Sequence, residues 1–113
     1  MADVIYINVE EGTKRVMNNT KLYVKLLTKF KDDPSLKDLD AALTAGEMGK
    51  AQNAAHTLKG LAANLSLIEL FNQSLELETQ IKAGSFNPDQ LAAVKNTYTQ
   101  TISEADKVIN QYA

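Results

Sequence analysis

The only histidine of the chain, His56, stands in the run Ala-His-Thr-Leu-Lys-Gly that covers residues 55–60. An imidazole can act near neutral pH as a nucleophile, a general base or a metal ligand. Lys59 follows one helical turn later, where its ammonium group would stand beside any negative charge that the histidine acquires. Glycine inside a helix costs about 1 kcal/mol relative to alanine, so Gly60 indicates a need for room. The three residues form a candidate reactive site.

The residues around His56 predict an amphipathic helix over roughly 47–64. Six of them follow steps of three and four and should share one buried stripe: Met48, Ala51, Ala55, Leu58, Ala62 and Leu65. At about 100° per residue, His56 lies at the edge of that stripe. Its neighbours around the helix are small or polar, namely Gln52, Lys59, Gly60 and Ala63. We therefore expect an imidazole that is open to an approaching molecule.

Spacing alone leaves several interpretations open. A single histidine on a helix is most often an ordinary surface residue, with Lys59 solvated and Gly60 incidental. A metal-binding bundle would need carboxylates beside the histidine, but Glu47, Glu69 and Glu78 show no compelling spacing toward it. A hydrolytic site would need a nucleophile, and none is adjacent in the sequence.

A family resemblance separates these interpretations. Residues 54–70 read Ala-Ala-His-Thr-Leu-Lys-Gly-Leu-Ala-Ala-Asn-Leu-Ser-Leu-Ile-Glu-Leu, and this stretch resembles the signature of histidine-containing phosphotransfer (HPt) domains. Looser similarity extends upstream through Glu11-Gly12 and residues 22–30, and downstream through residues 75–81. One position departs from the pattern, because the family commonly has glycine where this chain has Ser66. The matching positions are Ala55, His56, Leu58, Lys59, Gly60, Asn64 and Leu65.

The resemblance implies a phosphoryl carrier. A ring nitrogen of His56 would attack the phosphorus of an aspartyl phosphate on a response-regulator receiver domain, and a second receiver would take the group in the reverse reaction. The resemblance also suggests a hybrid sensor histidine kinase as a second kind of partner. The receiver would supply Mg²⁺, so we expect no cofactor or metal of the chain's own. Since the sequence has no ATP-binding motif, we expect no autokinase activity.

The resemblance also suggests roles for single residues. Lys59 would stabilise the phosphoryl oxygens, and Gly60 would allow close approach. Glu78 would face the histidine from the next helix and hydrogen-bond its second ring nitrogen, although a solvated glutamate is an equal alternative. Gln52 and Ala63 are expected only as neighbours. The docking surface should surround His56 and include apolar residues outside the core, such as Leu61.

The helix after the site has its own predicted start. Ser66 with Glu69 fits a capping box, in which Ser66 is the N-cap and Glu69 stands at N3. Leu65 and Leu70 then fall at the positions of a hydrophobic staple. This pattern would specify a helix start despite the missing glycine.

Length and composition agree with one small domain over residues 1–113. The chain has 113 residues, 44% of them apolar, and no cysteine for a disulfide or a thiolate metal site. A net charge of −2 argues against a nucleic-acid surface, and no apolar run approaches a membrane span. The start Met1-Ala2-Asp3 lacks the features of a signal peptide, so we expect a cytoplasmic monomer whose partners are proteins.

Helical periodicity runs through the whole chain, and no segment alternates as a strand would. This pattern predicts an all-α protein, packed as an antiparallel up-and-down four-helix bundle with a short additional N-terminal helix. The rival from another class is a helical adaptor that carries no phosphate and only docks a partner. Predicted boundaries are a helix start near Val9, a turn at Asn18-Asn19 with a start near Thr20, a kink or restart at Asp32-Asp33-Pro34, a stop at Ala45-Gly46, a stop near Gly84 and a start at Asn87-Pro88.

Overall fold

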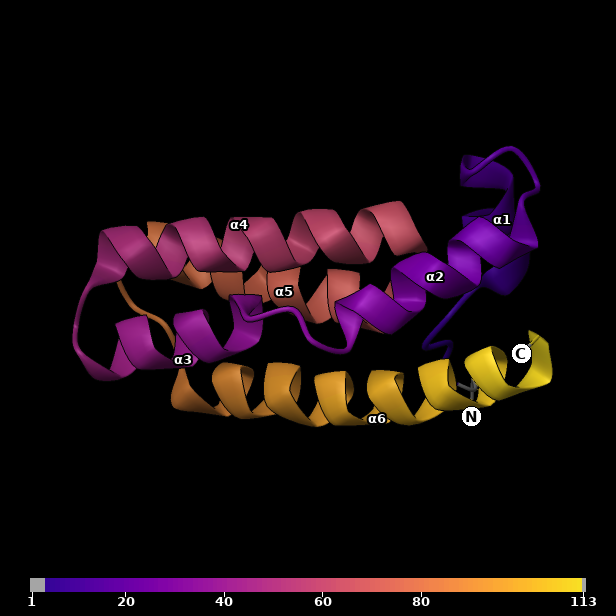
Figure 1. The fold of residues 1–113 in the computed structure, drawn as a ribbon. Helices are drawn as coiled ribbons and strands as arrows, with labels where there is room; N and C mark the ends of the chain where they lie inside the picture. The colour runs from indigo at the N-terminus through magenta and orange to yellow at the C-terminus, as the bar shows by residue number, and fades with distance from the viewer. Residues whose placement is uncertain (1–3, 113) are drawn as a thin grey trace.

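All regular elements of the part of the chain that the structure describes, residues 4–112, are helices. The structure is a computed structural model, and Figure 1 shows its helices stacked into an elongated bundle. The helices are α1 (Val9–Arg15), α2 (Thr20–Phe30), α3 (Ser35–Thr44), α4 (Met48–Leu65), α5 (Ile68–Lys82) and α6 (Pro88–Tyr112).

Asparagine side chains start the first two helices. The Asn8 side chain accepts a hydrogen bond from the amide of Glu11, and the Asn19 side chain accepts one from the amide of Leu22, each at 3.0 Å. Each bond satisfies an amide that has no partner within the first turn of its helix. The predicted starts near Val9 and Thr20 are confirmed.

The break at Pro34 is a full restart. Proline has no amide hydrogen to continue α2, and α3 begins immediately after it. The Asp33 carboxylate accepts a hydrogen bond from the amide of Ser35 at 2.8 Å, which satisfies one free donor of the new helix. The segment from 20 to 44 therefore forms two helices, α2 and α3, which follow one another along the bundle (Figure 1).

Tight turns bring the later helices alongside one another. Gly46 and Gly84 have φ values of 74° and 80°, the left-handed region that glycine enters without strain, and each ends a helix near its predicted stop. Helix α4 packs against α3 on one side and against α5 on the other, while α6 packs against α5 and α2. The long helices α4, α5 and α6 lie lengthwise in the bundle (Figure 1).

A continuous apolar core joins these helices, and it includes Tyr23, Leu27, Leu39, Leu58, Leu70 and Leu77. The stripe predicted on α4 is buried at Ala51, Ala55, Leu58, Ala62 and Leu65. Met48 is the exception: it is 38% exposed, because it opens the helix at the end of the bundle. Its predicted burial was wrong. The residues described contain no helix long and apolar enough to cross a membrane.

Helix α1 packs against the end of α4. The Tyr23 hydroxyl, completely buried, donates a 2.6 Å hydrogen bond to the carbonyl of Leu65. Gly12 packs directly over the Tyr23 ring, so closely that a Cβ atom there would stand 2.3 Å from a ring carbon. The amide of Asn8 adds a 2.9 Å bond to the carbonyl of Ser66. These contacts fix the turn between α4 and α5.

The predicted capping box at Ser66 is wrong. Ser66 ends α4 in the left-handed conformation, with φ 56° and ψ 43°, and α5 begins two residues later with Leu67 at its N-cap. The Ser66 hydroxyl does not cap α5. It donates to the Glu11 carboxylate at 2.9 Å and accepts from the Arg15 guanidinium at 3.3 Å. A left-handed residue reverses the chain here, which explains why glycine is common at this position of the family pattern.

Candidate functional site

His56 lies on the outer surface of α4 and meets a carboxylate from α5. Its side chain is 70% exposed, and its Nδ1 atom is 2.9 Å from Glu78 Oε2. Short side chains on the buried face of α4, such as Ala51, Ala55 and Ala62, let α5 approach closely. The structure therefore brings Glu78 to the imidazole, as the resemblance implied.

Glu78 is not the solvated glutamate of the alternative interpretation. It is only 2% exposed and belongs to the buried face of α5, together with Ser74, Leu77 and Ile81. A buried carboxylate needs compensating partners, because water no longer solvates its charge. Both oxygens have one: Oε2 meets His56, and Oε1 accepts a 2.7 Å bond from Lys59 Nζ.

The two partners set the charge of Glu78. Burial by itself would raise the pKa of this carboxyl, but the hydrogen bonds from Lys59 and His56, with attraction to Lys59 and Lys82, outweigh that effect. The net result is a pKa below the ordinary value of 4.5, so Glu78 is ionised at neutral pH. An ionised carboxylate only accepts hydrogen bonds, so His56 Nδ1 must carry the proton.

The tautomer that follows is the chemically useful one. In a neutral imidazole with the proton on Nδ1, the lone pair is on Nε2. Since Nδ1 is bonded to Glu78 and 70% of the side chain is exposed, Nε2 is the ring nitrogen left for an incoming electrophile. The site is thus an oriented, surface-exposed imidazole above a buried anion.

The other candidates occupy the surroundings of this cluster. Gly60 has open space where its Cβ would be, so nothing within the described chain requires glycine there. Gln52 and Ala63 are half-buried on the same helix, and no hydrogen bond joins Gln52 to His56, Lys59 or Glu78 within residues 4–112. Ala63 lines a small hollow beside α1 and the Ser66 turn.

Metal binding gains no support from the geometry. In the described segment no group of three or more histidine, cysteine, aspartate or glutamate side chains lies close enough to hold a metal ion. The one histidine–carboxylate pair also has the Lys59 ammonium 2.7 Å from its carboxylate, which a cation would have to displace.

Sequence reasoning missed the direct Lys59–Glu78 ion pair, and it did not include Lys82 in the site. A signal for the buried carboxylate was present, because position 78 continues the stripe of Ser74, Leu77 and Ile81 at helical spacing. A charged residue on a buried stripe requires a partner from another helix. The partner itself could be identified only once α4 and α5 were placed side by side.

Comparison with known families agrees with this geometry. The family model described as the Hpt domain matches residues 25–104, which include α3, α4 and α5 completely. No curated protein and no solved structure gave a match. The family match covers well over half of the chain and includes every residue of the His56 cluster, so the chain belongs to the Hpt domain family.

Proposed function

We propose that this chain is a phosphorelay intermediate that accepts a phosphoryl group on His56 from a receiver-domain aspartate, or from a kinase, and passes it to another receiver aspartate. Hpt domains act in phosphotransfer within two-component signalling, interact with receiver domains and kinases, and have no kinase activity of their own. The residue that carries the group and the two-receiver sequence are the parts that we propose.

One observation carries the proposal: the buried Glu78 carboxylate binds Nδ1 of an exposed imidazole and leaves Nε2 as the nucleophile. The Nε2 lone pair would attack the phosphorus of the aspartyl phosphate. The N–P bond forms as the P–O bond to the aspartate breaks, and the aspartate leaves with the electron pair as a carboxylate. No proton has to move, because Nδ1 keeps its hydrogen throughout.

Glu78 also favours the product. Once Nε2 binds phosphorus while Nδ1 keeps its proton, the ring becomes positively charged, and the carboxylate 2.9 Å from Nδ1 stabilises that charge. The imidazolium form is a good leaving group, so the phosphoryl group can return to a second receiver by the reverse step. A carrier needs this balance, because it must both accept and release the group.

The resemblance suggested that Lys59 stabilises the phosphoryl oxygens, but before any phosphoryl group arrives its partner is Glu78. Its Nζ binds Glu78 Oε1, so it keeps the carboxylate ionised, and its remaining N–H groups are available to phosphoryl oxygens. Gly60 leaves the surface beside His56 low, which suits a close partner. We propose that the Mg²⁺ needed for the transfer comes with the receiver domain.

We further propose that α2 and α3 together form one interrupted arm of an antiparallel up-and-down four-helix bundle with α4, α5 and α6, and that α1 is the short additional helix. The restart at Pro34 and the turns at Gly46 and Gly84 support this description. The single domain over 1–113, the monomeric state and the cytoplasmic location stay predictions of the sequence.

The test is phosphotransfer from a panel of Mg²⁺-loaded, aspartyl-phosphorylated receiver domains, with the modified residue mapped by mass spectrometry. We expect acid-labile phosphate on His56 and none on His56→Gln, whose folding is checked by circular dichroism. A phosphate that is alkali-labile or is mapped to another residue would refute the role of His56. Failure with every competent donor would instead favour the adaptor, which would tolerate His56→Gln without loss of partner binding.

A further inference from the structure

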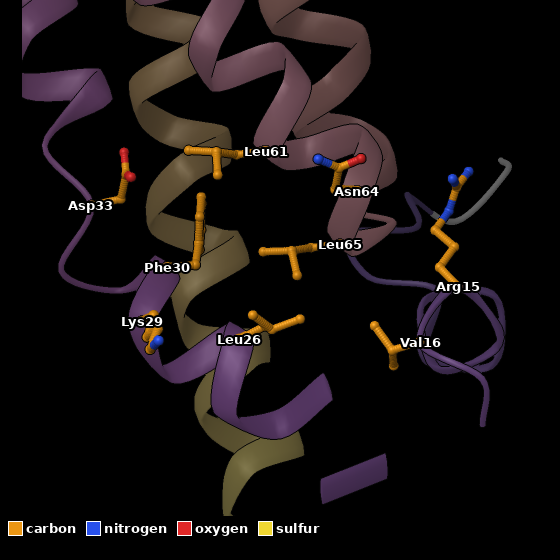
Figure 2. Close-up of a pocket in the computed structure, with 9 residues that line it drawn as sticks. All are labelled: Arg15, Val16, Leu26, Lys29, Phe30, Asp33, Leu61, Asn64 and Leu65. Atoms are coloured by element: carbon orange, nitrogen blue, oxygen red, sulfur yellow. The ribbon is translucent and has the colours of Figure 1, made fainter. Parts of the chain in front are cut away.

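A groove opens between the C-terminal half of α4 and α2. It has a volume of about 570 Å³, and Leu26 and Phe30 from α2 face Leu61 and Leu65 from α4 across it (Figure 2). Leu61 lies five residues beyond His56, which is about 7.5 Å along the helix axis. Around the axis, at about 100° per residue, Leu61 lies about 140° from His56, so the groove and the imidazole lie on opposite flanks of the exposed ridge of α4. A partner domain about 30 Å wide would contact both by straddling this helix, which is about 10–12 Å across.

The outer edge of this groove is basic. Helix α2 carries three lysines and no carboxylate, although the whole chain has a net charge of −2. Lys21, Lys25 and Lys29 are spaced four residues apart and are all exposed, and Lys29 lines the groove itself. Within residues 4–112 none of the three forms an ion pair, whereas Lys14, Lys31, Lys50, Lys59, Lys95 and Lys107 each do.

The helical register places these charges beside exposed apolar surface. At about 100° per residue, Leu22 and Leu26 lie about 20° and 60° from Lys29 on the side toward the groove, while Lys25 and Lys21 lie on the other side. Leu22 is 39% exposed, so it adds exposed apolar surface next to Lys29 in this register. The surface is therefore an apolar groove with one lysine-rich edge.

We propose that this lysine-edged groove is the docking surface for the phosphotransfer partner, and that it selects receiver domains that present an apolar anchor flanked by carboxylates. The inference rests on the proposed function and adds the chemistry that the partner must have. Apolar residues beside charges of one sign fit a partner of opposite charge, since juxtaposed like charges oppose association. The groove lining also contains one carboxylate, Asp33, which accepts a hydrogen bond from the Ser35 amide, and one further cation, Arg15. Since no ion pair within residues 4–112 engages the three lysines of α2, their charges remain available to a partner.

The proposal predicts a characteristic salt dependence. Attraction between exposed charges increases the association rate and is screened over about 10 Å at 0.1 M salt. Phosphotransfer at low receiver concentration should therefore slow as salt rises. The intrinsic reactivity of His56 with a small donor should not follow the same dependence, because a small donor needs no docking surface.

The experiment compares two triple variants with the same change in charge. The test variant is Lys21→Gln/Lys25→Gln/Lys29→Gln. The control is Lys37→Gln/Lys95→Gln/Lys107→Gln, whose lysines are exposed on α3 and α6. Each protein is assayed for kcat/KM with a phosphorylated receiver that modifies the unaltered chain, at low salt and at 0.5 M NaCl. Each is also assayed with phosphoramidate, a small phosphoryl donor.

We expect the test variant to lose about tenfold or more in kcat/KM at low salt, to lose much less at 0.5 M, and to react normally with phosphoramidate. The control should stay within about twofold of the unaltered chain. Equal behaviour of the two triple variants would overturn the docking surface while leaving the proposed function intact. If no receiver modifies the unaltered chain, the proposed function fails, and the inference fails with it.

A second variant tests the apolar part of the surface. Leu22→Ser removes an exposed side chain, so it should leave the fold unchanged, and we expect a higher KM for the receiver with normal phosphoramidate reactivity. An unchanged KM in Leu22→Ser would overturn the proposed apolar anchor and would leave recognition by charge alone. Loss of the phosphoramidate reaction in either variant would contradict a docking role, because it would indicate damage to the His56 cluster.

Discussion

Replacing Lys59 with methionine should lower the free energy of unfolding, because it leaves the buried Glu78 carboxylate with one compensating partner fewer. The ammonium of Lys59 is one of two groups that compensate Glu78, which is only 2% exposed. In the unaltered chain the lowered pKa of Glu78 stabilises the fold above pH 4.5, and this stabilisation is lost as the pH falls through the folded-state pKa. Without Lys59, desolvation should dominate and raise the folded-state pKa above the unfolded value.

The size of the effect has a ceiling that depends on pH. The folded variant can always avoid the buried charge by protonating Glu78, whose ordinary pKa is 4.5. At pH 7 that protonation costs about 3.4 kcal/mol, because pH 7 lies about 2.5 units above 4.5 and each unit is about 1.36 kcal/mol. At pH 5 the same cost is below about 1 kcal/mol. His56 still donates to Glu78, so we expect about 2 kcal/mol of destabilisation at pH 7.

The assay is urea denaturation of Lys59→Met and the unaltered chain from pH 5 to pH 8. A matched control is Lys107→Met, which removes an exposed ion pair with Glu104 and should cost less than about 0.5 kcal/mol at every pH. The double variant Lys59→Met/Glu78→Gln removes both charges and should recover most of the stability at pH 7. Repeating the series in a His56→Gln background tests whether titration of the imidazole, and not of Glu78, causes the pH dependence of stability.

The reasoning would be refuted by a loss of stability in Lys59→Met that does not grow between pH 5 and pH 8. Such a result would mean that Glu78 remains ionised at no cost, and hence that water or another group solvates it. The reasoning would also be refuted if Lys59→Met/Glu78→Gln were no more stable at pH 7 than Lys59→Met.

Three further predictions concern packing, access and a buried hydroxyl. Gly12→Ala should destabilise the fold by about 1–3 kcal/mol in thermal or urea unfolding, because the new Cβ would stand 2.3 Å from the buried Tyr23 ring; unchanged stability would show that α1 shifts freely. Gly60→Ala should stabilise α4 by about 0.5–1 kcal/mol and yet slow transfer from a receiver, whereas Gly49→Ala, also in open space, should not slow it. Burial, followed by the nearby Glu11 charge, raises the pKa of Tyr23 to about 12, so the contribution of Tyr23 to stability should be constant below pH 10 and fall by about 3 kcal/mol between pH 10 and 12. Tyr23→Phe should lack this alkaline loss, and an equal loss in that variant would assign it to another group.

Most helix boundaries could be predicted because they depend on local chemistry. Asn8 and Asn19 cap helices through their own side chains, and Pro34 forces a restart through its missing amide hydrogen. Gly46 and Gly84 mark helix ends because glycine tolerates positive φ. Each of these effects acts within a few residues, so a single sequence is enough to reveal it.

Ser66 could not be placed correctly because distant residues determine its conformation. Its side chain and Glu69 fit a capping box, but the hydroxyl instead bonds Glu11 and Arg15, more than fifty residues earlier in the chain. Packing of α1 against the end of α4 thus replaces a local cap. The family's preference for glycine at this position was the better guide, since it reflects a left-handed backbone whichever side chain is present.

The site likewise has features that depend on local sequence and features that depend on contacts between distant residues. Helical spacing alone was enough to place His56 at the edge of the buried stripe of α4, and its exposure agrees. The role of Lys59 was not predictable from α4, because its partner Glu78 lies on α5 and nineteen residues away. A charged residue on a buried stripe indicates from the sequence alone that an oppositely charged partner is needed. The sequence does not identify which cation forms the ion pair with it.

The shared carboxylate explains how so small a site can serve a carrier. Glu78 uses one oxygen to fix the tautomer of His56 and the other to hold Lys59, so a single buried charge orients the nucleophile and keeps a cation next to it. Phosphorylation on Nε2 would add negative charge outside the ring and positive charge within it, and both are then adjacent to a group of opposite sign. Since this arrangement stabilises the product without a dedicated acid or base, the direction of transfer would be set by the partner that docks and not by the site itself.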